Sequence, residues 1–107
     1  MRCEDEAGGV DWLVGAVLSS FLGTFRTKRA SFTARALKRF ARERLGVNLD
    51  RIQPLALSRA IRRLLAAGVV DARGRLWLLL GEEEGWRDGR RTLYRAALAE
   101  EVAAGAV

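Results

Sequence analysis

The first apolar pattern along the chain is typical of a helix. Its members recur at steps of three and four residues, and they are Leu13, Val14, Val17, Leu18 and Phe21. Asp11 stands where a side chain can cap the N-terminus, and Gly23 follows as a stop signal. We therefore expect a helix from Asp11 to about Phe21, preceded by an acidic and frayed N-terminus over residues 1–10.

Two further segments repeat this periodicity, and each is bounded by a start and a stop signal. Thr33 can cap a second helix that Gly46 ends, and Pro54 fits the first position of a third helix that Gly68 ends. The apolar stripe of the second helix consists of Leu37, Phe40, Ala41 and Leu45, and that of the third of Leu57, Ile61, Leu64 and Leu65. Both stripes predict helices that are held by packing against a core.

Beyond the third helix, the pattern changes to short apolar runs separated by a turn. Val69 to Asp71 predicts a strand, Ala72-Arg73-Gly74 a tight turn, and Arg75 to Leu80 a second strand. After the acidic stretch 81–85, we expect a last helix from about Trp86 to Val102. Its apolar face would carry Trp86, Leu93, Ala97 and Leu98, with Tyr94 and Val102 beside it. The predicted fold class is thus mostly α with a small β-hairpin, in the order helix, helix, helix, hairpin, helix.

The predicted organisation is one domain. With 107 residues the chain is too short for two comfortable cores, and it contains no internal repeat and no linker rich in Pro, Gly or Ser. We expect residues 11–80 to form the domain. Residues 81–107 would supply the acidic loop and a C-terminal helix that packs on the domain or on a partner subunit.

Positive charge is concentrated in the middle of the chain. The formal net charge is +6, from 19 basic and 13 acidic residues. Residues 26–75 hold fourteen basic residues against three acidic ones, a net charge of +11, while segments 1–25 and 76–107 carry net charges of −3 and −2. Such a block favours a polyanionic partner, because ordinary surface charge is interspersed. Nearly all the basic residues are arginine, which suits phosphate and guanine, although a compositional bias of the source organism would also enrich arginine.

Several classes of function lack the residues they require. The chain has no histidine and a single cysteine, Cys3, so the sequence offers neither an intramolecular disulfide nor a zinc site. Without a nucleophile motif or a glycine-rich phosphate loop, we expect no enzyme, no cofactor and no small-molecule substrate. The run Glu82-Glu83-Glu84 is expected to be a solvated loop rather than a metal site. The apolar stretch Trp12 to Leu22 is too short to cross a bilayer, and the acidic start does not fit a secretory signal, so we expect a cytoplasmic protein.

Two stretches resemble the winged-helix family of DNA-binding domains. Phe32-Thr33-Ala34-Arg35-Ala36-Leu37 is similar to the short strand and capped second helix of that family. Ser58-Arg59-Ala60-Ile61-Arg62-Arg63-Leu64-Leu65-Ala66-Ala67-Gly68-Val69-Val70-Asp71 is similar to its recognition helix running into the first strand of the wing. With the hairpin, the likeness spans about residues 10–80. It implies a winged-helix architecture whose third helix lies in the major groove of duplex DNA, while the tip of the wing touches the neighbouring minor groove or phosphates.

The resemblance also implies which side chains contact the DNA. Those expected to face the groove are Ser58, Arg59, Arg62 and Arg63, and those expected on the wing are Arg73 and Arg75. Basic residues that lie off the apolar stripe of the second helix are candidates for phosphate contacts, and they are Arg35, Lys38, Arg39 and Arg42. We therefore expect a double-stranded DNA-binding protein, such as a transcription regulator or a chromatin- or replication-associated factor.

Two other functions stay open at this point. A winged helix can serve as a protein-interaction scaffold in a replication, transcription or ribosomal assembly, and an arginine-rich domain can recognise the A-form shape of RNA. Separately, the first and last expected helices carry more apolar surface than a small domain requires. This excess predicts a homodimer through one or both of these helices.

Overall fold

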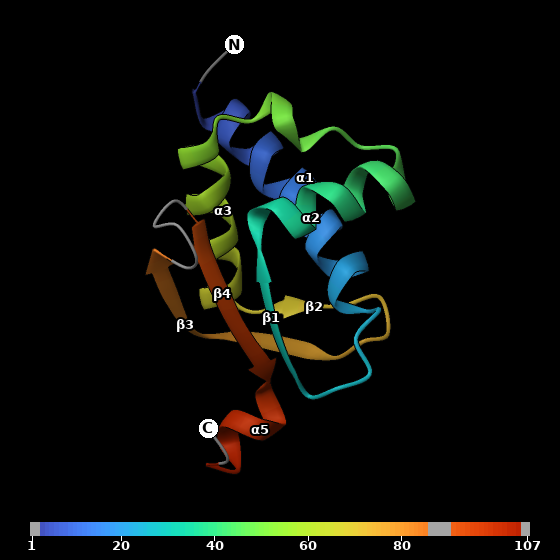
Figure 1. Ribbon diagram of the computed structural model, residues 1–107, viewed down its shortest axis with the longest axis vertical. Coiled ribbons are helices and arrows are strands. Elements are labelled where there is room, and N and C mark those ends of the chain that lie inside the picture. The colour runs from blue at the N-terminus through green and yellow to red at the C-terminus, as the bar shows by residue number, and fades with distance from the viewer. Residues whose placement is uncertain (1–2, 86–90, 106–107) are drawn as a thin grey trace.

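The computed structural model describes residues 3–85 and 91–105, which form an α/β fold with helices on one side of a sheet (Figure 1). Two of its elements are short helices of other types: η1 (Ala41–Leu45) is a turn of π-helix, and η2 (Leu49–Arg51) is a turn of 3-10 helix. The elements in chain order are α1 (Cys3–Leu22), β1 (Arg29–Thr33), α2 (Ala34–Phe40), η1 (Ala41–Leu45), η2 (Leu49–Arg51), α3 (Pro54–Ala67), β2 (Val69–Val70), β3 (Leu76–Gly85), β4 (Arg91–Leu98) and α5 (Ala99–Ala103).

The sheet has four antiparallel strands in the order β1-β4-β3-β2. β3 and β4 form a long hairpin, and β1 pairs along the other edge of β4, while β2 contributes only two residues beside the start of β3. A β-bulge between Leu79 and Gly81 shifts the register of β3 against β4. Such a bulge changes the face to which the following side chains point.

The core lies between the sheet and the helices. α1 packs against α3, and α3 packs against β3. Phe32, Trp77 and Tyr94 extend from three strands into this layer and are almost fully buried. Phe21 of α1 meets three other phenylalanine rings edge to face, at centroid distances of 5.1–5.3 Å from Phe25, Phe32 and Phe40. Aromatic residues thus supply much of the apolar area that holds α1 and α2 to the sheet.

The local signals of the second and third helices are confirmed. The amide of Ala36 donates to the Thr33 hydroxyl across 3.2 Å, so Thr33 is the N-cap of α2. Helical structure then continues through η1 to Gly46, whose φ of 66° lies in the left-handed region that glycine adopts readily. α3 begins at Pro54 and ends at Gly68, as their positions predict.

The prediction of a last helix over residues 86–102 is wrong. Arg91–Leu98 is strand β4, and only Ala99–Ala103 is helical. Tyr94, Ala96 and Leu98 alternate toward the core, and backbone pairing with both β1 and β3 outweighs the helix propensity of this alanine-rich segment. Trp86 lies outside the described residues. The fold therefore contains a larger sheet than the small hairpin expected from the sequence.

Two boundaries also differ from the prediction. α1 begins at Cys3 rather than at Asp11, so residues 3–10, expected to be frayed, are its first turns. Asp11 is not a cap, because it lies inside α1, and its carboxylate accepts hydrogen bonds from Arg63. β3 continues to Gly85 rather than ending at Leu80, so Glu82 to Glu84 belong to a strand and not to a loop. None of the helices in the described part of the chain is long and apolar enough to span a membrane.

Candidate nucleic-acid interface

The basic residues of α2 and η1 gather on one face. Their spacing of three and four residues places them side by side around a surface hollow of about 420 Å³. The residues lining this hollow are Arg35, Lys38, Arg39, Arg42 and Asp50. Lys38 Nζ lies 3.1 Å from Asp50 Oδ1, but no acidic side chain in the described part of the chain pairs with the three arginines. The three arginines of this face therefore carry positive charge that no acidic residue among the described ones neutralises.

Apolar contacts on the opposite side fix the rotation of this segment. Leu37 and Ala41 are fully buried, and Phe40 packs edge to face against Phe21 of α1. Because these three residues hold one side against the core, the basic side chains between them must face solvent.

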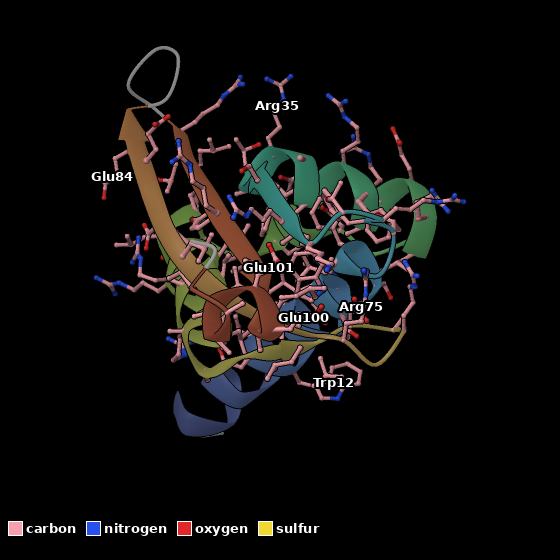
Figure 2. The ribbon with its side chains drawn as sticks, turned by 90° about the horizontal axis from the view of Figure 1, so that it is seen from below. Trp12, Arg35, Arg75, Glu84, Glu100 and Glu101 are labelled. Atoms are coloured by element: carbon pink, nitrogen blue, oxygen red, sulfur yellow. The ribbon has the colours of Figure 1, made fainter. Side chains whose placement is uncertain are left out.

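A second hollow, of about 160 Å³, lies between α2, α3 and β4 and shares Arg35 with the first. It adds Arg91 of β4, which also has no acidic partner within residues 3–85 and 91–105. Its other lining residues are Thr33, Ala34, Pro54, Ser58, Thr92 and Tyr94. Because the two hollows share Arg35, five residues form one surface, which we call the basic track: Arg91, Arg35, Lys38, Arg39 and Arg42. Figure 2 shows Arg35 projecting into solvent on the side opposite Trp12.

The arginines of α3 differ in their surroundings. Arg59 is exposed and has no ion pair with any described residue. Arg62 donates from both Nε and Nη2 to the carboxylate of Glu82 on β3, with Nη2 2.9 Å from Oε1. Arg63 donates in the same way to Asp11 on α1, with Nε 3.1 Å from Oδ2. The hydrogen bonds to these carboxylates raise the pKa of both guanidinium groups above the usual value.

Ser58 is tied to the core side of α3. Its hydroxyl lies 2.8 Å from the phenol oxygen of Tyr94, and Arg62 Nη2 lies 3.4 Å from the same hydroxyl. Burial of Tyr94 raises the pKa of its phenol, so this group stays a neutral hydrogen-bonding partner at physiological pH. Ser58 is therefore a half-buried member of a hydrogen-bonded chain rather than a free groove-facing side chain.

The turn between β2 and β3 is organised around the buried carboxylate of Asp71. Oδ1 accepts from the amides of Arg73 and Arg75 at 2.8 and 3.0 Å. Oδ2 accepts from Arg75 Nε at 2.9 Å and from Trp77 Nε1 at 2.8 Å. Burial alone works to raise the pKa of Asp71, but the hydrogen bonds from Trp77, Arg75 and Arg73 outweigh it and lower the pKa below its usual value.

Arg73 and Arg75 bind this turn to the end of α1. Arg75 Nη2 donates to the carbonyl oxygens of Leu22 and Phe25 at 3.2 and 2.7 Å, and Arg73 Nη1 donates to Phe25 at 3.2 Å. The Arg75 guanidinium also lies over the Trp77 ring, 5.4 Å from its centroid. The two arginines expected at the tip of a wing thus make intramolecular contacts, and Arg75 is only 22% exposed.

The structure brings together the four candidates for phosphate contacts on the second helix, Arg35, Lys38, Arg39 and Arg42. Arg73 and Arg75 are not part of this group, because they lie in the turn around Asp71. Sequence reasoning missed Arg91, because it lies in a segment that is acidic in total and was expected to be helical. The dipeptide Asp88-Gly89, shortly before Arg91 in the sequence, is a hairpin signal that could have placed it.

The acidic run on β3 does not converge on one point. Glu82 turns toward α3, whereas Glu83 binds Arg95 with 2.9 Å between Oε2 and Nη2. Across the described residues, no group of three Asp, Glu or Cys side chains is arranged to hold a metal ion.

Comparison of the chain with protein-family models, with curated proteins and with solved structures finds no match.

Proposed function

We propose that the protein binds double-stranded DNA through the basic track, mainly by contacts with backbone phosphates. The observation that carries this proposal is the set of arginines around the two hollows, which are without acidic partners among the described residues. A guanidinium group binds two phosphate oxygens at once, and neutralising phosphates releases counterions. Four arginines on one surface, with no acidic partner in the part of the chain that the structure describes, have little structural use, because neighbouring like charges repel each other.

The order of the elements supports a winged-helix-like arrangement for this binding. α1, β1, α2 and α3 are followed by the hairpin β3–β4, and β1 lies beside β4 in the sheet. In this proposal, α3 takes the place of the recognition helix, and the β3–β4 hairpin takes the place of the wing. The turn around Asp71 is not given that role, since its arginines donate hydrogen bonds to the carbonyl oxygens of Leu22, at the end of α1, and of Phe25 after it.

Within this arrangement, α2 and η1 contribute more charge to the DNA than α3 does. Arg59 is the one exposed arginine of α3 that has no ion pair within the described chain. We propose that Arg59 faces the groove, while the phosphate contacts of the basic track fix the position of the protein on the duplex.

A salt titration of DNA binding tests the proposal. One phosphate contact changes the slope of log affinity against log salt by about 0.9, which corresponds to about fivefold in affinity at about 0.15 M salt. In a fluorescence-anisotropy assay with a mixed-sequence duplex, we expect Arg39→Ala and Arg42→Ala each to bind about fivefold more weakly than the wild type. The slope of log affinity against log salt should become shallower by about 0.9 in each variant.

Arg95→Ala is the matched control, because it removes the same charge from β4, where Arg95 is already paired with Glu83. This variant should bind within about twofold of the wild type. Equal losses in Arg39→Ala and Arg95→Ala would show that binding depends on net charge and not on the track. A flat salt dependence in the wild type would favour a protein-interaction scaffold, and tighter binding of structured RNA would favour an RNA-binding role.

A further inference from the structure

Arg62 lies next to one end of the basic track but is occupied by an internal partner. Its Nη2 is 3.4 Å from the hydroxyl of Ser58, and Ser58 lines the same hollow as Arg35 and Arg91. The fork that Nε and Nη2 of the Arg62 guanidinium form nevertheless points at Glu82. A phosphate in that hollow would meet a guanidinium whose hydrogen-bonding fork is already filled.

The β-bulge in β3 is what turns Glu82 toward α3. Leu79 lies opposite Ala96, but after the bulge Gly81 rather than the next residue lies opposite Arg95. The shift places Glu82 opposite Tyr94, on the helix side of the sheet, where its side chain is 17% exposed. Without the extra residue, side chains alternate so that Glu82 would point to the outer face. Glu83 does point there, toward Arg95.

We propose that Glu82 competes with the polyanion for Arg62, and that it thereby excludes this arginine from the DNA-binding surface. The inference rests on the proposed function, since it concerns the α3 end of the same basic track. The Nε–Nη2 fork cannot serve a carboxylate and a phosphate together, so a phosphate that binds through this fork must first displace Glu82. The charge of Glu82 also opposes a phosphate that approaches the remaining N–H groups of Arg62. Arg62 is 41% exposed, which leaves it accessible once the carboxylate is removed.

Two consequences separate this role from a purely structural ion pair. In the wild type, Arg62→Ala should change the affinity for duplex DNA by less than about twofold, because Arg62 contributes no phosphate contact. With Glu82→Gln, the side chain keeps its shape but loses its charge, and Arg62 becomes available. Affinity should then rise about fivefold at about 0.15 M salt, and the slope of log affinity against log salt should steepen by about 0.9.

Glu83→Gln is the control for this experiment. It removes the same charge one residue away and also releases an arginine, Arg95 of β4, but on the opposite face of the sheet. The full set is the wild type, Glu82→Gln, Glu83→Gln, Arg62→Ala and the double variant Arg62→Ala/Glu82→Gln. All are titrated with one mixed-sequence duplex at several salt concentrations, with circular dichroism to confirm folding.

The inference predicts that Glu82→Gln binds DNA more tightly, and with a steeper salt dependence, than Glu83→Gln does. In the double variant Arg62→Ala/Glu82→Gln, this increase in affinity and slope should disappear. If the wild type binds DNA but Glu82→Gln and Glu83→Gln behave alike, the competition is refuted while the proposed function stands. Weaker binding by a folded Glu82→Gln variant, or a gain that persists in the double variant, would refute it as well. If the wild type shows no salt-dependent DNA binding, the proposed function fails first, and the inference fails with it.

Discussion

Replacing Asp71 tests whether the turn between β2 and β3 is a structural clamp. The carboxylate accepts four hydrogen bonds, and its side chain is fully buried. In Asp71→Asn, one oxygen can still accept from the two backbone amides. The new amide group would face Arg75 Nε and Trp77 Nε1, which are both donors.

The free-energy cost of Asp71→Asn comes from two donors that lose their acceptor, Arg75 Nε and Trp77 Nε1. Trp77 is fully buried, and an unsatisfied buried donor costs about 1–3 kcal/mol. Arg75 loses a charge-assisted hydrogen bond in a site where it is 22% exposed, which adds a similar amount. We expect a total loss of about 3–5 kcal/mol, as for other ion pairs that lose one buried partner. For a domain of this size, that lowers the melting temperature by at least about 12 °C.

Thermal melts of Asp71→Asn, followed by circular dichroism, measure this loss. Because the folded-state pKa of Asp71 is lowered, its stabilisation is fully present above the unfolded-state pKa of about 4. It is lost as the pH falls through the lower pKa of the folded state. The difference in melting temperature between wild type and variant should therefore shrink below about pH 4. A variant that melts within about 2 °C of the wild type at neutral pH would refute the reasoning.

Four further predictions concern stability and assembly. Arg75→Ala should lower the melting temperature but leave DNA affinity within about twofold of the wild type, because the contacts of Arg75 are intramolecular. If this variant instead lost affinity without losing stability, Arg75 would contact DNA as expected for a wing residue. Ile61→Ala, at a fully buried position, should lower the free energy of unfolding by about 2–5 kcal/mol in chemical denaturation. A loss below about 1 kcal/mol would contradict the packing of α3. Gly68→Ala should lower the free energy of unfolding by about 1–3 kcal/mol in the same assay, because φ of Gly68 is 108° and an added Cβ would lie 3.0 Å from the Leu76 side chain. An unchanged denaturation midpoint would contradict this strain. Trp12 is 74% exposed on α1, so Trp12→Ala should lower the mass seen in light scattering while the far-UV circular dichroism spectrum stays unchanged. A monomeric wild type at tens of micromolar would count against the homodimer.

The parts of the fold that depend on short-range signals follow from the sequence. The boundaries of α2 and η1 come from a cap at Thr33 and a left-handed glycine at Gly46, and those of α3 from Pro54 and Gly68. Each of these signals acts within one or two turns of helix, so no tertiary information is required to detect it.

β4 could not be predicted in this way, because its conformation depends on partners. Arg91–Leu98 is rich in residues with good helix propensity, and it is a strand because β1 and β3 pair with its two edges. The same reason applies to the site. Nothing near Arg62 or Arg63 in the sequence reveals that Glu82 and Asp11, 20 and 52 residues away, hold their guanidinium groups. The spacing of three and four residues between the basic residues of α2 and η1 is visible in the sequence, whereas the neutralisation of Arg62 and Arg63 on α3 is not.

The position of β4 in the sheet has a consequence for biosynthesis. β4 lies between β1 and β3, yet it is the last of the four strands to be translated. Until it leaves the ribosome, β1 has no strand to pair with, and β3 is paired only with the two residues of β2. Sheet formation is therefore postponed to a late stage of synthesis, while α1, α2 and α3 can begin to associate earlier. A nascent chain stalled before Arg91 would expose an unpaired β1 edge, which is the kind of segment that chaperones bind and that aggregates in their absence.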